Sequence, residues 1–287
     1  MTRASKPMDD LFANSAQPQA NTGNTIRIGI GGWTYAPWRD GMFYPAGLVQ
    51  RRELEYASRQ LNSIEINGTY YGVQKPATYA KWRDETPADF LFSAKAPQRI
   101  MESRKLSGTG HQIEDFIGGI AELGDKLGPL AWQFDKGRRI DAEEFASFLG
   151  LLPTAHAGRR LRHVLDVRDP GFIDADYLAL ARRHGMATVF TDSEEHPSFA
   201  DLTADFVYAR LMRSRADLIT GYPDDELQAW EQRARQWAQG DDPAELPHVT
   251  GLPAPRVARE VFLYFISSAK ERNPSAAMAL LKRLGLS

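Results

Sequence analysis

The chain has 287 residues, 43% of them hydrophobic and 25% charged, which is typical of a globular protein with one large α/β barrel or two ordinary domains. It contains no cysteine, which excludes disulfide bonds, thiolate catalysis and cysteine-held metal centres. A formal net charge of −2 gives no global attraction to nucleic acid, and no apolar run reaches the roughly 20 residues of a membrane span. We therefore expect a soluble, cytoplasmic protein with no membrane partner.

Strand-like and helix-like segments alternate along the chain after a polar beginning. Residues 1–24 lack the apolar core of a signal peptide, so we interpret them as a disordered tail and residues 25–287 as one domain. Short apolar, β-branched runs predict strands at 26–30, 63–67, 90–95, 129–134, 162–168, 187–192, 205–210 and 259–266. Amphipathic segments with caps predict helices at 51–60, 76–84, 111–126, 141–151, 174–184, 224–238 and 274–284.

This succession of strands and helices predicts the fold class. Eight strands, nearly all followed by a helix, in this chain length favour a single (β/α)8 barrel of the TIM-barrel type. A doubly wound sheet is the alternative, but its glycine-rich turn is incomplete in Gly29-Ile30-Gly31-Gly32-Trp33. No clear helix falls between the sixth and seventh strands, and residues 240–258, rich in Pro and Asp, are predicted to form a loop.

The second predicted strand has one apolar and one polar face. Ile64 and Ile66 share one face, and Ser63, Glu65 and Asn67 share the other. Strands of a parallel sheet are normally apolar on both faces, and burying an unpaired carboxylate is costly. This strand is therefore expected to point into a polar mouth.

Other predicted strands also end in polar residues, and barrel enzymes place their chemistry at these carboxyl ends. The candidate catalytic residues are Glu65, Lys95, Asp166 and Asp192. The candidate substrate-binding residues are Trp33, Tyr35, Asn67, Tyr70, Gln133, Arg168, Arg210 and Tyr264. The alternative for each of them is a helix cap or a mutually satisfied ion pair.

The same residues limit the choice of metal. Of the six histidines only His196 lies just beyond a strand, so a multi-histidine zinc centre is not expected. Glu65, Asp166 and Asp192 supply oxygens of the kind that Mg²⁺ or Mn²⁺ prefers. Neighbouring cations such as Lys95 favour ion pairing instead, so no metal or other cofactor is predicted.

Two functions fit this anion-binding pocket. In the first, an enzyme acts on a phosphate- or carboxylate-bearing small molecule such as a nucleotide or sugar phosphate; the lysine and arginines hold the anion and Glu65 is the general base or acid. In the second, the mouth binds an anionic ligand or a nucleic-acid segment without turnover. That alternative needs a basic strip beyond the mouth, for which the candidates are Arg99, Arg104, Lys105, Arg213 and Arg215. The sequence leaves open both turnover and the oligomeric state.

Several motifs together resemble a known family. They are Gly32-Trp33-Thr34-Tyr35, Glu65-Ile66-Asn67-Gly68-Thr69-Tyr70-Tyr71, Phe92-Ser93-Ala94-Lys95-Ala96-Pro97, Leu127-Gly128-Pro129-Leu130-Ala131-Trp132-Gln133-Phe134, Asp166-Val167-Arg168-Asp169-Pro170-Gly171-Phe172 and Tyr208-Ala209-Arg210-Leu211. The chain resembles the YecE-like family, domain of unknown function 72, over roughly residues 26–285. The resemblance implies a TIM barrel and a soluble bacterial protein, and it implies no established activity.

The chain departs from the family pattern at positions in the predicted mouth. Family members typically have Glu, His and Trp where this chain has Asp166, Asp169 and Phe172. They typically have His-Gly where it has Met212-Arg213, and Asn-Asn where it has Ile266-Ser267. The missing histidines argue against imidazole-based acid–base or metal chemistry in this protein.

Overall fold

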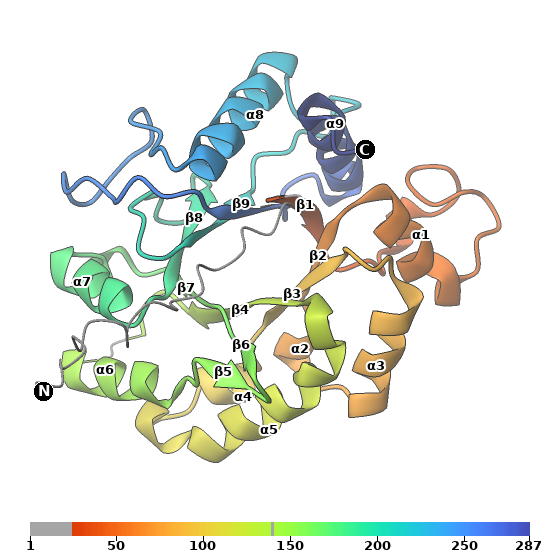
Figure 1. Cartoon of the computed structure of the whole chain (residues 1–287). Coiled ribbons are helices and arrows are strands. Elements are labelled where there is room, and N and C mark those ends of the chain that lie inside the picture. The colour runs from red at the N-terminus through yellow and green to blue at the C-terminus, as the bar shows by residue number, and fades with distance from the viewer. Residues whose placement is uncertain (1–24, 139–140) are drawn as a thin grey trace, which may run out of the picture.

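A computed structural model describes residues 25–138 and 141–287, so the tail predicted at residues 1–24 lies outside the described residues. Eight parallel strands close into a barrel in the order β1-β10-β9-β8-β7-β4-β3-β2 (Figure 1). They are β1 (Ile26–Gly31), β2 (Ser63–Ile66), β3 (Leu91–Lys95), β4 (Leu127–Phe134), β7 (His163–Val167), β8 (Ala187–Asp192), β9 (Phe206–Leu211) and β10 (Glu260–Phe265). The predicted strands and the barrel fold are confirmed.

Helices surround the barrel as a ring (Figure 1). The longer ones are α1 (Glu53–Gln60), α3 (Pro76–Glu85), α5 (Gly110–Ile120), α6 (Ala142–Leu151), α7 (Ala175–Arg183), α8 (Asp224–Gln239) and α9 (Asn273–Leu284). Each matches a predicted helix, although α5 gives way to a 3-10 turn, Ala121–Lys126, in which Gly124 has a φ of 61°. No described helix separates β8 from β9, as the sequence predicts. None of the described helices is long and apolar enough to cross a bilayer.

Two short helices and a hairpin were not predicted. The helices α2 (Gly68–Tyr71) and α4 (Gln98–Met101) follow β2 and β3, and β5 (Ala155–His156) pairs antiparallel with β6 (Arg159–Arg160). Each has four residues or fewer, too short to show a hydrophobic period.

The strands have two different apolar faces. Outward residues such as Ile28 and Ile30 pack under the helices, whereas Val189, Tyr208 and Phe262 pack inside the barrel. Successive side chains of a strand alternate between these faces. The inward residues nearest the carboxyl ends therefore form the wall of the barrel mouth, above a filled interior.

Hydroxyl pairs fill part of that interior below the mouth. The Tyr264 hydroxyl lies 2.7 Å from Ser63 Oγ, and the Tyr208 hydroxyl lies 2.8 Å from Ser93 Oγ. Both serine hydroxyls also donate to backbone carbonyls of neighbouring strands. These four hydroxyl groups thus all have partners and form the floor of the mouth.

Candidate functional site in the barrel mouth

A cavity of about 340 Å³ opens at the carboxyl ends of the strands. Its wall comes from strand ends far apart in the sequence and from the segment that follows β10. The lining residues are Gly31, Glu65, Asn67, Tyr71, Lys95, Arg168, Arg210, Met212, Ile266, Ser267, Lys270 and Asn273. This set contains four cations and one carboxylate, which is the composition expected of an anion-binding cavity.

Arg210 is the centre of a buried ion network at the base of this cavity. Its side chain is 2% exposed, and its Nε and Nη2 donate to Glu65 Oε2 at 3.0 and 2.8 Å. Its Nη1 donates to Asp166 Oδ2, and the Tyr208 hydroxyl donates to Glu65 Oε2. Burial by itself lowers the pKa of Arg210, but the two carboxylates outweigh it and raise that pKa. Arg210 is therefore held in its charged form.

Asp166 also receives a second arginine. Arg168 Nε and Nη2 each donate to Asp166 Oδ2 at 3.2 Å, while the Arg168 side chain remains 21% exposed. Burial raises the pKa of Asp166, but Arg210 and Arg168 outweigh that effect and lower it. Two guanidinium groups thus share one carboxylate, which leaves Arg168 with donors for a ligand.

Lys95 lies in the same wall without an anionic partner. Its Nζ is 4.2 Å from the centre of the Tyr70 ring, and among the described residues no carboxylate pairs with it. Burial, and then the positive charge of Arg210, lower the pKa of Lys95 to about 8. Lys95 therefore exchanges its proton close to neutral pH.

Lys270 is a second lysine in the wall that has aromatic instead of acidic neighbours. Its Nζ lies 4.6 Å from the centre of the Tyr35 ring and 5.6 Å from that of Trp38. Burial lowers the pKa of Lys270. Tyr71 stands at the rim with 83% of its surface exposed, an unusual exposure for an aromatic side chain beside a cavity.

Two buried oxygens of the wall have no hydrogen-bond donor. Glu65 Oε1 and Asn273 Oδ1 are inaccessible to solvent and accept no hydrogen bond from any described residue. Buried polar atoms normally have a partner, so each orphaned acceptor needs an explanation. Neither oxygen is accessible from the cavity, so both are unsatisfied acceptors inside the wall and not contacts for a ligand.

The structure brings most of the predicted site residues to this cavity or directly behind it. Those that line it are Glu65, Asn67, Lys95, Arg168 and Arg210. Asp166 lies behind the two arginines, and Tyr70 lies against Lys95. Gln133 donates to Asp135 Oδ1 at 2.6 Å, and the Tyr70 hydroxyl donates to the other oxygen of Asp135. Gln133 thus supports the wall from outside the cavity.

The structure does not place Asp192 in the mouth. Ala187 and Val189 point into the barrel, so Asp192, at odd spacing from both, falls on the outer face of β8. It lines a separate cavity with Arg213, whose Nη1 is 3.9 Å from its Oδ1. Burial raises the pKa of Asp192. The expectation that its carboxylate meets those of Glu65 and Asp166 is wrong, because the parity of the strand turns it away.

Tyr264 points inward but lies below the cavity. It is fully buried, and Ile266, two residues further along, lines the mouth in its place. Its ring occupies space that a side chain on Gly29 would need: a Cβ there would lie 3.1 Å from the ring and 2.2 Å from the Ser63 carbonyl oxygen. The expected contact of Tyr264 with a ligand is therefore not supported.

Trp33 and Tyr35 are packing residues rather than wall residues. Trp33 contacts Trp82 edge to face at 4.8 Å, and its carbonyl oxygen accepts from the Tyr44 hydroxyl. Tyr35 packs on Trp38 at 5.2 Å and meets the cavity only through Lys270. Aromatic residues after a first barrel strand therefore shape the rim here without lining the cavity.

The candidate site residues named from the sequence omitted Lys270, Asn273 and Tyr71. All three lie in segments directly after strands β10 and β2, where barrel enzymes build their sites from loops. Position directly after a strand is the one signal that the sequence offers for them, and it does not distinguish them from neighbours such as Trp33 and Tyr35 that only pack.

The described residues hold no cluster of three or more acidic, histidine or cysteine side chains arranged to bind a metal. Arg210 occupies the space between Glu65 and Asp166, and Asp192 faces away from both. An Mg²⁺ or Mn²⁺ ion on these three carboxylates would have to displace an arginine, so the residues do not fit such an ion.

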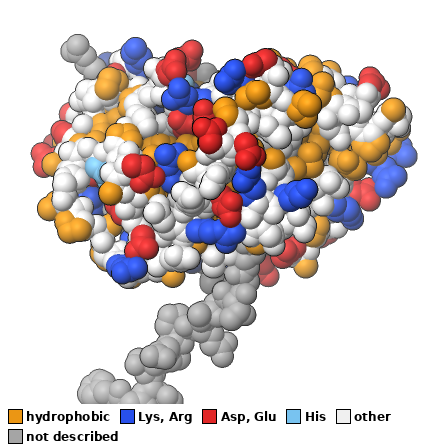
Figure 2. All heavy atoms as spheres, turned by 90° about the horizontal axis from the view of Figure 1, so that it is seen from above, with side chains coloured by type: hydrophobic (Ala, Val, Ile, Leu, Met, Phe, Trp, Pro, Cys, Tyr) orange, Lys and Arg blue, Asp and Glu red, His pale blue; other side chains and the backbone are white. Residues whose placement is uncertain are grey.

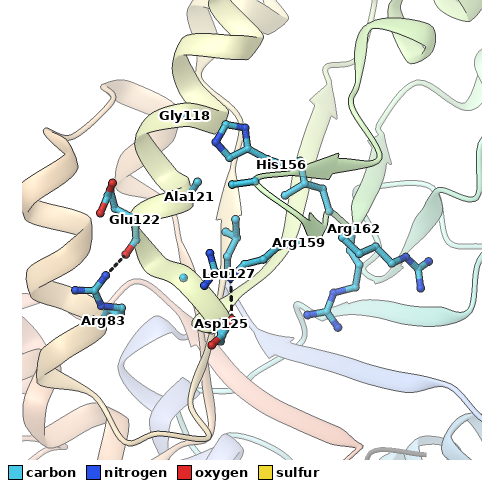
Figure 3. Close-up of a pocket in the computed structure, with 13 residues that line it drawn as sticks. Arg83, Gly118, Ala121, Glu122, Asp125, Leu127, His156, Arg159 and Arg162 are labelled. Atoms are coloured by element: carbon cyan, nitrogen blue, oxygen red, sulfur yellow. Dashed lines mark hydrogen bonds and ion pairs between the residues drawn. The ribbon is translucent and has the colours of Figure 1, made fainter. Parts of the chain in front are cut away.

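A larger cavity, of about 540 Å³, lies at the opposite end of the barrel, near the start of β4 and the β5–β6 hairpin (Figure 3). Its arginines are already paired: Arg159 with Asp125 at 2.8 Å, and Arg83 with the Glu122 carbonyl oxygen at 3.0 Å. Conserved chemistry in barrels lies at the other end, so this cavity is the weaker candidate.

Fold and site together define a TIM-barrel protein with a cation-rich cavity at the carboxyl ends of its strands. The chain belongs to the family described as protein of unknown function DUF72, which it matches over residues 27–287. The resemblance seen in the sequence motifs is therefore confirmed.

Relatives and solved structures agree with this assignment. UPF0759 protein YecE is 26% identical in Escherichia coli O157:H7 and 29% identical in strain K12, over 253 residues that cover 79% of this chain and 87% of each relative. A DUF72 family protein from Thermotoga maritima superposes with a TM-score of 0.71 at 19% identity, covering 91% of this chain and 99% of that one. SacUVDE superposes with a TM-score of 0.52 at 13% identity, covering 91% and 100%, which shows a shared fold only.

Proposed function

We propose that this protein is an enzyme that acts on a small molecule bearing a phosphate or carboxylate group, bound in the mouth cavity. The observation that carries the proposal is the surplus of positive charge in the wall. Lys95 and Lys270 contact aromatic rings instead of carboxylates, and Arg168 shares Asp166 with Arg210. Desolvated cations without partners are costly, and an anionic ligand would compensate them.

The other residues of the cavity wall indicate which further groups the ligand carries. The Asn67 side chain, which lines the cavity, offers an amide oxygen and an amide nitrogen to hydroxyl or amino groups of the ligand. The exposed ring of Tyr71 offers a flat apolar surface at the rim for a sugar or a base. A volume of about 340 Å³ is at the small end of ligand cavities. A sugar phosphate or a nucleotide combines these properties.

The pKa of Lys95 in the cavity wall supports an enzymatic function. Lys95, with a pKa of about 8, can accept or donate a proton near neutral pH, which is the requirement for a general acid or base. Glu65 is held by Arg210 and Tyr208 at Oε2, and in this proposal it fixes the position of Arg210 in the wall.

The alternative, a nucleic-acid segment bound without turnover, has less support. Of the arginines that would extend a basic strip, Arg213 pairs with Glu194 at 3.0 Å and Arg215 pairs with Asp217 at 2.8 Å. Figure 2 shows acidic and basic side chains interspersed on the face seen from above Figure 1. Neutralised pairs of this kind give little attraction to a phosphate backbone.

Replacing Arg168 with alanine is expected to weaken binding of an anionic ligand about 10- to 150-fold, because a charge-assisted hydrogen bond in a shielded wall contributes about 1.5 to 3 kcal/mol. The measurement is calorimetric titration with a panel of sugar phosphates, nucleotides and short carboxylic acids. Arg104→Ala is the matched control, since Arg104 is exposed and has no partner among the described residues. Equal losses in both variants would indicate diffuse surface binding and contradict the proposal.

A further inference from the structure

Lys95 differs from the two arginines of the cavity in that an aromatic ring holds it and no carboxylate of the described residues does. Its ammonium group rests on the Tyr70 ring, and the Tyr70 hydroxyl is directed at Asp135 Oδ2, 3.4 Å away. Asp135 is in turn held by Gln133. The ring is therefore fixed, while no acceptor among the described residues occupies the hydrogen-bonding positions of Lys95 Nζ.

The surroundings of Lys95 favour the neutral amine. Burial, then Arg210 and Arg168, lower its pKa to about 8, although Glu65 and Asp166 act in the opposite direction. At pH 7 roughly a tenth of such amines are neutral, against less than about a thousandth of ordinary lysines. A desolvated lysine beside another cation is a known arrangement for an amine nucleophile.

We propose that Lys95 is a nucleophile that forms an imine with an aldehyde or ketone carrying a phosphate or carboxylate group. This inference rests on the proposed function, which supplies the anion-binding wall. The Nζ lone pair forms a bond to the carbonyl carbon, and the carbonyl oxygen takes a proton to give a carbinolamine. The oxygen then leaves with both original amine protons as one water molecule, and the carbon–nitrogen double bond remains.

The wall orients such a substrate. The anionic group would lie against Lys270 and Arg168, which come from the segments after β10 and β7. Hydroxyl groups of the substrate would hydrogen-bond to the Asn67 side-chain amide. Lys95, at the end of β3, then faces the carbonyl carbon between these two sets of contacts.

The test is reductive trapping with glyceraldehyde 3-phosphate and cyanoborohydride, followed by peptide mass spectrometry. Lys95 is expected to be modified at limiting probe, ahead of the exposed Lys75 and Lys105. The rate should rise about tenfold per pH unit below pH 8 and level off above it. Glyceraldehyde, which lacks the phosphate, should label Lys95 more slowly, and Lys270→Ala should reduce the difference between the two probes.

Lys95→Arg keeps a positive charge at this position but has no nucleophilic amine, so it should lose the adduct. If the exposed lysines are modified and Lys95 is not, the proposal that Lys95 forms an imine is refuted. If phosphate still binds the wild-type cavity in that case, the anion-binding function stands and only the nucleophile is refuted. Failure of phosphate and of all panel anions to bind would refute both proposals.

Discussion

Replacing Arg210 with methionine is expected to lower the free energy of unfolding by about 3 to 5 kcal/mol, because it leaves Glu65 as a buried carboxylate without a cation and Asp166 with Arg168 alone. Methionine preserves much of the side-chain length, so the loss reports charge more than volume. The measurement is equilibrium denaturation in urea, followed by far-UV circular dichroism at neutral pH.

Arg213→Met is the matched control. Its side chain is 50% exposed and pairs with Glu194 at the surface, so its loss should cost under about 1 kcal/mol. Adding Glu65→Gln to the Arg210 variant should recover part of the stability, since the carboxylate left without a cation is removed. Equal effects of the Arg210 and Arg213 replacements would show that the buried network contributes no more than a surface pair.

The free energy of unfolding is also expected to fall by about 3 kcal/mol between pH 6.5 and pH 4 through His163 alone. This ring accepts at Nδ1 from Trp132 Nε1 at 3.0 Å, so its Nε2 donates to the Pro153 carbonyl oxygen at 2.8 Å. Burial lowers the pKa of His163 from 6.5 to about 4. Below pH 6.5 the unfolded chain therefore gains a proton that the folded chain rejects, and each pH unit costs about 1.4 kcal/mol.

Unfolding measured at pH 7, 5.5 and 4 in the wild type and in His163→Gln isolates this contribution from that of the carboxylates. The non-titrating variant should show a shallower loss of stability toward acid. His111→Gln is the control, since the His111 side chain is fully exposed, and it should follow the wild type. Parallel curves for the wild type and His163→Gln would contradict a buried neutral imidazole.

The sequence determined the barrel because its strands have a strong local signal. Runs such as 187–192 and 259–266 are apolar, bounded by turn residues and separated by capped helices, as at Asp141, whose side chain accepts from the Glu144 amide. The two strands of the β5–β6 hairpin have two residues each, which is too short for such a local signal. Their pairing depends on the fold around them.

The sequence predicts where the site lies but not which of its charged residues pair with one another. Polar residues at strand ends indicated the mouth, and Glu65, Lys95, Arg168 and Arg210 line it. Sequence order does not reveal that Arg210 binds two carboxylates while Lys95 binds none, because these contacts join strands that meet only when the barrel closes. The error at Asp192 has the same origin, because Val189 and Phe190 are apolar on opposite faces of the strand and only the closed barrel shows that Val189 points inward.

The ion network around Arg210 also affects when the barrel can close during synthesis of the chain. Glu65 precedes Arg210 by 145 residues, which a ribosome adding about 5 to 20 residues per second translates in roughly 7 to 30 seconds. During that interval the first strands contain the carboxylate without its arginine. Collapse around Glu65 at that stage would bury a lone charge, so the early strands gain most by remaining hydrated until β9 emerges. The ion network thereby favours barrel closure late in synthesis.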